Sequence, residues 1–258
     1  MTASIVDAHI HFDLYTEKDR REILESLEAN GIASMITVSS HLTSGIKNLT
    51  IALDDKRIKP ALGYHPEQPL PSKEEIEDIT SLARRYSSSI SAIGEVGLPY
   101  YSRKEDPSID VEAYVKLLEH FIKLAAELNK PIVLHAIYED ADLVCDLLKK
   151  YGVRNAHFHW FKGSATTIQT LMENDYYISV TPDCVYKTKI QKLIEVYPLN
   201  RIMVETDGPW PFEGPFKDKM THPVMMHDSI AKISEIKCLP LQTVYRIIYQ
   251  NTVRLFHL

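Results

Sequence analysis

The sequence has few cysteines and no long apolar run. Its three cysteines, Cys145, Cys184 and Cys238, lie far apart and form no C-x-x-C pair. We therefore expect no disulfide framework and a reducing compartment. No apolar stretch approaches the roughly 18 residues of a membrane-spanning helix. The N-terminus has no basic segment followed by a long apolar run, so no signal peptide is predicted and the expected location is the cytoplasm.

An excess of positive charge is also missing. The 258 residues contain 29 lysines and arginines against 35 acidic residues, which gives a net charge of -6. Proteins whose main task is to coat nucleic acid are usually basic, so this class is disfavoured. An enzyme that acts on nucleic-acid ends remains open, because bound metal ions can supply positive charge where phosphate is held.

Short apolar runs alternate with longer amphipathic stretches along the chain. The amphipathic stretches at 16–31, 111–130 and 141–152 are predicted helices, and the tail at 239–258 is predicted to form one or two more. Predicted strands cover residues 4–10, 33–39, 57–64, 89–97, 131–136, 155–160, 176–180 and 201–207.

This alternation predicts parallel strands joined by crossover helices. Eight such units favour a single (β/α)8 TIM barrel, an α/β fold, with a C-terminal helical extension, formed as one domain by residues 1–258. An open, doubly wound sheet is the alternative, although no G-x-G-x-x-G follows the first strand.

Polar side chains follow most of the predicted strands. In the opening segment DAHIHFD (7–13), Asp7, His9 and His11 share one face of a strand. Each such residue alone has an ordinary structural explanation, such as a hydrogen-bonded core histidine or a turn cap. Together they would meet at the C-terminal end of a barrel, where active sites lie. These residues are His9, His11, His65, Glu95, His135, His159 and Asp207.

Burying several imidazoles and carboxylates without a cation would cost several kcal/mol, and a bound metal removes that cost. The pattern therefore predicts a metal centre. In the same segments, the sequence resembles the TatD family of metal-dependent hydrolases. The motifs that carry the resemblance are DAHIHFD, GYHP (63–66), AIGEVGLPYY (92–101), PIVLHA (131–136), HWFKG (159–163), VETDGPW (204–210) and NTVRLF (251–256).

The resemblance implies two divalent metal ions, Mg, Mn or Zn. One would be held by His9, His11 and Asp207 and the other by His135 and His159, with Glu95 bridging both. His65 would contact the scissile group. The same alignment leaves His157 and Glu205 one layer deeper, and Asp7 is expected to orient a metal-bound histidine.

The implied activity is a metal-dependent hydrolase of ester bonds. It would be a deoxyribonuclease that trims single-stranded or frayed DNA ends through a hydroxide bridging the two metals. Asp207 would be the general base, with Glu95 and His65 the other catalytic residues. The alternative is an amide or ester hydrolase, such as a deacylase, and a third class is a binding module without activity. A monomer is favoured.

Three segments depart from the family pattern. Pro99 stands where an acid is usual, Ile137 where an arginine is common, and FKDKMTHP (216–223) replaces a basic segment. The last two weaken the expected contacts to phosphate. Lys162, Lys217 and Lys219 could replace them, and Tyr100 and Tyr101 could either stack on a base or pack internally.

Overall fold

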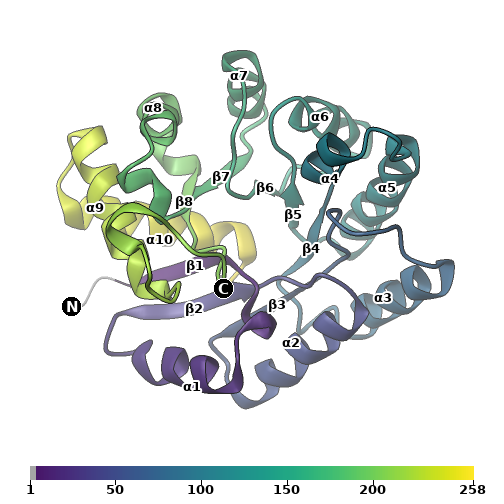
Figure 1. The fold of residues 1–258 in the computed structure, drawn as a ribbon, viewed down its shortest axis with the longest axis horizontal. Helices are drawn as coiled ribbons and strands as arrows, with labels where there is room; N and C mark the ends of the chain where they lie inside the picture. Colours follow the sequence, from purple (N-terminus) through teal and green to yellow (C-terminus); the bar gives the residue numbers. More distant parts are fainter. Residues whose placement is uncertain (1–3) are drawn as a thin grey trace.

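The computed structural model describes residues 4–258, so the first three residues of the predicted domain lie outside it. Eight parallel strands follow one another around a barrel in chain order (Figure 1). The strands are β1 (Ile5–Ile10), β2 (Ile32–Thr37), β3 (Ile58–Leu62), β4 (Ala92–Gly97), β5 (Ile132–His135), β6 (Ala156–Phe158), β7 (Tyr177–Val180) and β8 (Ile202–Val204).

Backbone hydrogen bonds join the first strand to the segment after the last. The amide of Asp207 donates to the carbonyl of His9 at 2.9 Å, and the amide of His11 donates to the carbonyl of Gly208 at 2.8 Å. The predicted TIM barrel is therefore confirmed, and the open-sheet alternative is wrong.

Helices cover the outside of the barrel and include all three predicted ones, as α1, α5 and α6. The tail forms one helix, α10, which is preceded by α9. The α-helices are α1 (Glu17–Ser26), α2 (Leu42–Asp54), α3 (Lys73–Arg85), α4 (Tyr100–Glu105), α5 (Val111–Leu128), α6 (Asp140–Lys150), α7 (Ala165–Glu173), α8 (Thr188–Val196), α9 (Met226–Lys237) and α10 (Leu241–Phe256). Short 3-10 turns occupy Phe12–Leu14, Pro182–Val185, Leu199–Arg201, Gly214–Phe216 and Pro223–Met225.

Local sequence signals explain where these helices begin and end. The Thr16 side chain accepts the amide of Asp19 and caps the start of α1. Asn129, with φ 50°, ends α5 in the left-handed conformation that asparagine tolerates, and Pro131 follows it. No helix within residues 4–258 combines the length and apolar character needed to cross a membrane.

Several strands are shorter than predicted. β4 begins at Ala92 rather than at residue 89, and β8 ends at Val204 rather than at residue 207. Asp207 has φ 50°, and Trp160, two residues past the end of β6, has φ 36°. L-residues leave the extended conformation at such angles, so the chain turns at Trp160 and at Asp207 and both strands end before them.

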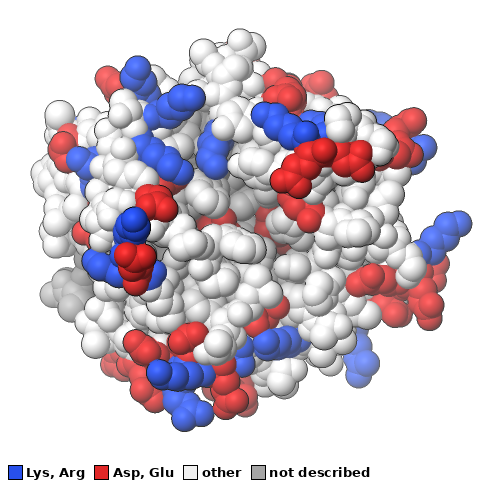
Figure 2. Space-filling model, viewed as in Figure 1, with Lys and Arg blue, Asp and Glu red and all other residues white. Residues whose placement is uncertain are grey.

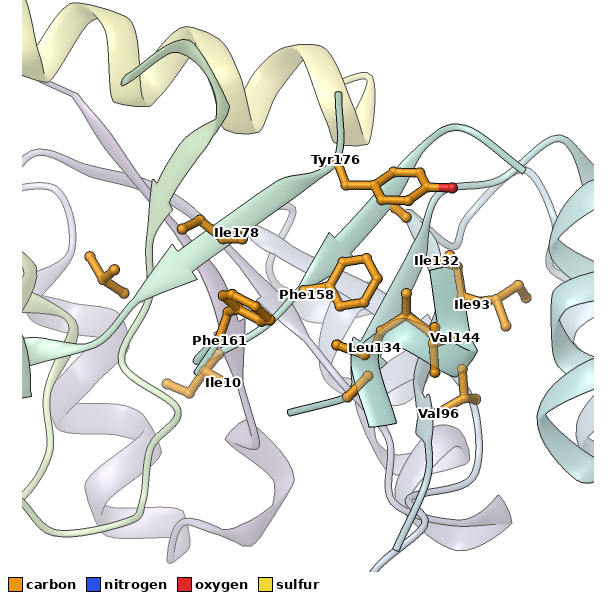
Figure 3. Packing of buried hydrophobic residues seen from close by; sticks show 14 of the residues in the cluster. Ile10, Ile93, Val96, Ile132, Leu134, Val144, Phe158, Phe161, Tyr176 and Ile178 are labelled. Atoms are coloured by element: carbon orange, nitrogen blue, oxygen red, sulfur yellow. The ribbon is translucent and has the colours of Figure 1, made fainter. Parts of the chain in front are cut away.

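Apolar side chains fill the space between the strands and the helices. Phe158 packs close to Phe161 and Tyr176, with Leu134 and Ile178 on the neighbouring strands (Figure 3). A second, smaller cluster joins strand residues to Leu255 and Phe256 at the end of α10. The tail is thus part of the barrel core.

A close approach between β4 and β5 generates a prediction. A Cβ on Gly97 would lie 2.0 Å from the carbonyl oxygen of His135 and 2.9 Å from its Cβ. Gly97→Ala should therefore lower the free energy of unfolding by about 1–3 kcal/mol. It should also weaken Zn²⁺ binding, because His135 must move. Urea unfolding of the metal-free protein and Zn²⁺ titration measure the two effects.

Gly152→Ala is the control, because its Cβ would meet no atom within 4 Å. Gly152 has φ 68°, so the substitution should cost about 1–2 kcal/mol from its backbone conformation alone. Its Zn²⁺ affinity should match that of the parent. Equal Zn²⁺ affinity in the Gly97 variant would show that this contact does not position His135.

Candidate metal centre

Residues from five strand ends converge in one buried cluster. His9 lies in β1, Glu95 in β4 and His135 at the end of β5. His11, His159 and Asp207 lie in the turns after β1, β6 and β8. The structure therefore brings together all six predicted ligands, and each is at most 8% exposed.

One oxygen of Glu95 faces the histidines of β1. Glu95 Oε2 lies 3.2 Å from His9 Nε2 and 3.3 Å from His11 Nε2. Asp207 Oδ1 lies 3.4 Å and 3.6 Å from the same two nitrogens, which are 3.4 Å apart. Two nitrogens and two carboxylate oxygens therefore surround one point.

The other oxygen of Glu95 faces a second group of histidines. Glu95 Oε1 lies 2.7 Å from His159 Nε2 and 3.0 Å from His135 Nδ1, and these two nitrogens are 3.2 Å apart. His65 Nε2 is 3.4 Å from the same oxygen, and its side chain is 21% exposed. A single carboxylate thus lies between two sets of imidazoles.

The spacing and the lack of hydrogen bonds fit a bound cation. Nitrogen ligands about 2.0–2.1 Å from a metal lie roughly 3.0–3.4 Å from one another, which is close to the observed separations. Within residues 4–258, Glu95 Oε2 and Asp207 Oδ1 are buried and have no hydrogen-bond partner. Unpaired buried carboxylate oxygens are costly, and a divalent ion would satisfy them. The donor set of imidazole and carboxylate suits Zn or Mn.

Burial and neighbouring charges have opposite effects on the pKa values of the histidines in the cluster. Burial lowers the pKa of His9 far below its usual value. Burial opposes the protonation of His11 and His159, but the nearby negative charge of Glu95 raises the pKa of both. Burial raises the pKa of Asp207 to about 7. A bound cation must therefore displace protons from these imidazoles.

A deeper layer of polar groups supports the cluster. Glu205 accepts the amide of Trp160 at 2.7 Å, and His157 Nε2 lies 2.6 Å from the Ser179 hydroxyl. His157 and Glu205 therefore lie one layer below the cluster, as expected. His157 also contacts the Phe256 ring, with the centroids 6.0 Å apart.

Asp7 forms no hydrogen bond to an imidazole ring within residues 4–258, so it acts on His9 through the backbone rather than through the side chain. Its carboxylate accepts the Thr206 hydroxyl at 2.6 Å, the Thr206 amide at 3.0 Å and the His9 amide at 3.2 Å. Burial raises its pKa to about 8. Asp7 thus connects β1 to the segment that carries Asp207, and it positions the cluster through the backbone.

A cavity of about 470 Å³ opens above the cluster, and Figure 2 shows this face hollowed at its centre. Tyr101 and Trp210 line it and are 45% and 49% exposed. Of the lysines proposed to replace the missing arginine, Lys162 lines the cavity. Lys217 and Lys219 do not, and Lys219 donates to the Pro215 carbonyl.

The two tyrosines after β4 have different environments. Tyr100 is buried, with its ring 4.9 Å from that of Tyr138, whereas Tyr101 faces the cavity. The buried Ile137 also lines the cavity where the family commonly has an arginine. Pro99 precedes the first turn of α4.

Sequence reasoning missed Glu67, Trp160 and Trp210. Glu67 Oε1 lies 3.2 Å from His135 Nε2, and its carboxylate also accepts the amides of Tyr101 and Ser102 at 2.7 Å. Burial opposes its ionisation, but the bonds from His135 and Ser102 lower its pKa to about 2. Its only sequence signal is its place two residues after His65 in GYHPEQ.

The arrangement of these residues agrees with comparisons to known proteins. A family model described as TatD related DNase matches residues 6–257. The chain belongs to the TatD family. The resemblance seen in the sequence is therefore confirmed, and with it the prediction of a metal-dependent hydrolase that acts on ester bonds.

Relatives within the TatD family match over nearly the whole chain. An uncharacterized metal-dependent hydrolase of Haemophilus influenzae is 37% identical over 98% of this chain and all of its own length. The human deoxyribonuclease TATDN3 is 27% identical, over 98% of this chain and 94% of its own. The crystal structure of the Escherichia coli TatD homologue YjjV matches with a TM-score of 0.90 at 24% identity over all of both chains, which shows the shared fold.

The contact between Glu67 and His135 yields a prediction for this TatD-family cluster. By accepting a hydrogen bond from the Nε2–H of His135, Glu67 keeps the ring proton on Nε2 and leaves the Nδ1 lone pair facing Glu95. Glu67→Ala should therefore weaken divalent-metal binding by about 10–100-fold. Titration of the apoprotein with Zn²⁺ and Mn²⁺ measures this loss.

Glu105→Ala is the matched control, because Glu105 also lines the cavity but is exposed. It removes the same charge from the cavity and should leave metal affinity close to that of the parent. Equal losses in both variants would mean that general electrostatics, rather than the bond to His135, accounts for the effect. Thermal unfolding of each apoprotein separates either outcome from a folding defect, since Glu67 also caps α4.

Proposed function

We propose that the chain is a phosphodiesterase that hydrolyses DNA at single-stranded or frayed ends. The observation that carries this proposal is the Glu95 carboxylate, whose two oxygens face two separate sets of imidazoles. Membership of a family described as TatD related DNase supports it, as does the name of the human relative. The exposed rings of Tyr101 and Trp210 offer stacking surfaces for bases at the cavity.

The two oxygens of Glu95 support a site with two ion positions. We infer that His9, His11 and Asp207 hold one divalent ion, that His135 and His159 hold the other, and that Glu95 bridges them. Such ions, when bound, make a water molecule more acidic and neutralise charge on phosphate oxygens. Mg, Mn and Zn are the candidates.

His65 has a different role from the ligands. Its Nδ1 accepts the amide of Glu67 at 3.1 Å, so the ring proton is on Nε2. A protonated Nε2 cannot ligate a metal, although it lies 3.4 Å from Glu95 Oε1. We infer that His65 donates from Nε2 to a phosphate oxygen of the substrate and stabilises the charge that develops there.

Asp207 has the properties of a proton acceptor. It lines the cavity beside the first ion position, and its Oδ1 faces His9 and His11. The second carboxylate oxygen is then left to accept a proton from a water in the cavity. We infer that Asp207 orients the attacking water and takes its proton, while Glu95 holds the two halves of the site in register.

An amide or ester hydrolase is the second candidate, and two features favour it. Ile137 presents an apolar side chain where an arginine would contact phosphate, and Glu67 and Glu105 add negative charge to the cavity. An uncharged acyl substrate would meet less repulsion from these two carboxylates than a phosphodiester would.

The bridging role of Glu95 predicts joint loss of both ions. Glu95→Gln keeps the side-chain volume but removes the charge, so both ions should dissociate together. His9→Ala should deplete mainly one ion, because His9 faces only one oxygen of Glu95. Metal content after dialysis, measured by mass spectrometry, gives the stoichiometry. A Glu95 variant that retains two ions per chain would contradict the bridge.

Asp207→Asn should abolish cleavage while the barrel stays folded. Loss of a general base reduces rates by about 10²–10⁴-fold. The assay follows end-labelled single-stranded and blunt duplex DNA, RNA and a p-nitrophenyl acyl ester, each with Mg, Mn and Zn. Activity on the ester alone would replace the nuclease proposal by the acyl-hydrolase one. Equal DNA cleavage by parent and variant would indicate a contaminating nuclease.

A further inference from the structure

A groove lies between two neighbouring outer helices, α7 and α8. Its volume is about 750 Å³. Apolar side chains from both helices line it, including Ile168, Met172, Leu193 and Val196, and Val196 is 57% exposed. The outer helices of a barrel usually bury their apolar side chains. The exposed Val196 departs from this pattern, so the groove offers apolar surface to a ligand.

Lysines are concentrated along the same groove. Lys162, Lys187, Lys189 and Lys192 line it, and of its described lining residues none is acidic. Figure 2 shows basic side chains gathered over α8 and toward α7. This concentration is notable in a chain with a net charge of -6.

The four lysines differ in how they are engaged. Lys187 pairs with Asp183 at 2.9 Å, and Lys162 lies over the Trp160 ring at 4.2 Å. Lys189 and Lys192 are exposed, and neither forms an ion pair within residues 4–258. These two are three residues apart on α8, so they project from the same side of the helix.

The groove adjoins the cavity over the metal cluster. Lys162 lines both, and its carbonyl accepts the amide of Tyr138, which lines the groove and is 38% exposed. A ligand that fills the groove would therefore contact Lys162, which lines the cavity together with Asp207 and His159.

We propose that this groove binds a segment of single-stranded nucleic acid adjoining the nucleotide in the central cavity. The proposal rests on the proposed function and extends it to a binding subsite. Bases would lie on the apolar floor and against Tyr138, and phosphates would contact the lysines. The nine residues of α8 extend about 13 Å, the length of about four stacked nucleotides.

An acidic amphipathic helix of a partner protein would also match an apolar floor rimmed by lysines. Nucleic acid is favoured because the groove shares Lys162 with the cavity of the site that would cleave it. The two occupants give different results in a binding experiment.

The experiment compares binding of fluorescein-labelled single strands of 3 and 12 nucleotides by fluorescence anisotropy. Metal is chelated so that the strands stay intact. The variant is Lys189→Ala/Lys192→Ala. Its matched control, Lys116→Ala/Lys123→Ala, removes two exposed lysines from α5, on another side of the barrel (Figure 1).

The parent should bind the 12-mer more tightly than the 3-mer. The slope of log affinity against log salt should be shallower in the groove variant by about 1.4, at about 0.7 per lost phosphate contact. From 50 to 200 mM salt, the parent should then lose about sevenfold more affinity than the groove variant. The control variant should keep the slope of the parent.

Three results would overturn the groove assignment: equal binding of both strand lengths, equal slopes in the two variants, or tighter binding of a glutamate-rich helical peptide than of the 12-mer. Hydrolysis of a p-nitrophenyl ester of thymidine 5′-monophosphate by the metal-loaded parent tests the proposed function separately. A chain that binds the 12-mer through Lys189 and Lys192 but hydrolyses no diester would retain the groove and lose the nuclease proposal.

Discussion

The Glu95 carboxylate is the constraint on which the arrangement of the centre depends. It is completely buried at the end of β4, and imidazoles from β1, β5 and the turn after β6 surround it. A buried charge of this kind is tolerated only where opposite charge is held close to it. The strands must therefore converge at this end, and the closed barrel achieves this convergence through the backbone bonds between His9, Asp207 and their neighbours.

The turns after the strands complete the centre at some conformational cost. Trp160 and Asp207 both adopt positive φ angles, which are unfavourable for residues other than glycine. Hydrogen bonds to carboxylates deep in the barrel hold both turns: Glu205 accepts the Trp160 amide, and Asp7 accepts the amide and hydroxyl of Thr206. Polar groups deep in the barrel thus stabilise backbone conformations at its mouth.

The sequence predicted the strand order and the convergence of the six polar residues, because both follow from periodicity and from the geometry of parallel strands. The strand ends were less accurate, since nothing in HWFKG or VETDGPW distinguishes a final strand residue from a residue at positive φ. Glu67 escaped notice because its partner His135 is 68 residues away and only the folded barrel brings them together. The folded structure is also needed to decide which lysines lie near the site. Lys162 lines the cavity, whereas Lys217 and Lys219 lie outside it.

The closure of the barrel has a consequence for biosynthesis. Asp7 bonds to Thr206 across 199 residues, and Phe256 at the end of α10 packs beneath the cluster. During translation, the histidines of β1, β5 and β6 leave the ribosome long before Asp207 and α10 do. The four imidazoles of the cluster are therefore synthesised before the Asp207 carboxylate that completes it and before the Phe256 ring that packs beneath it. The cluster is therefore complete only when the two ends of the described chain have met.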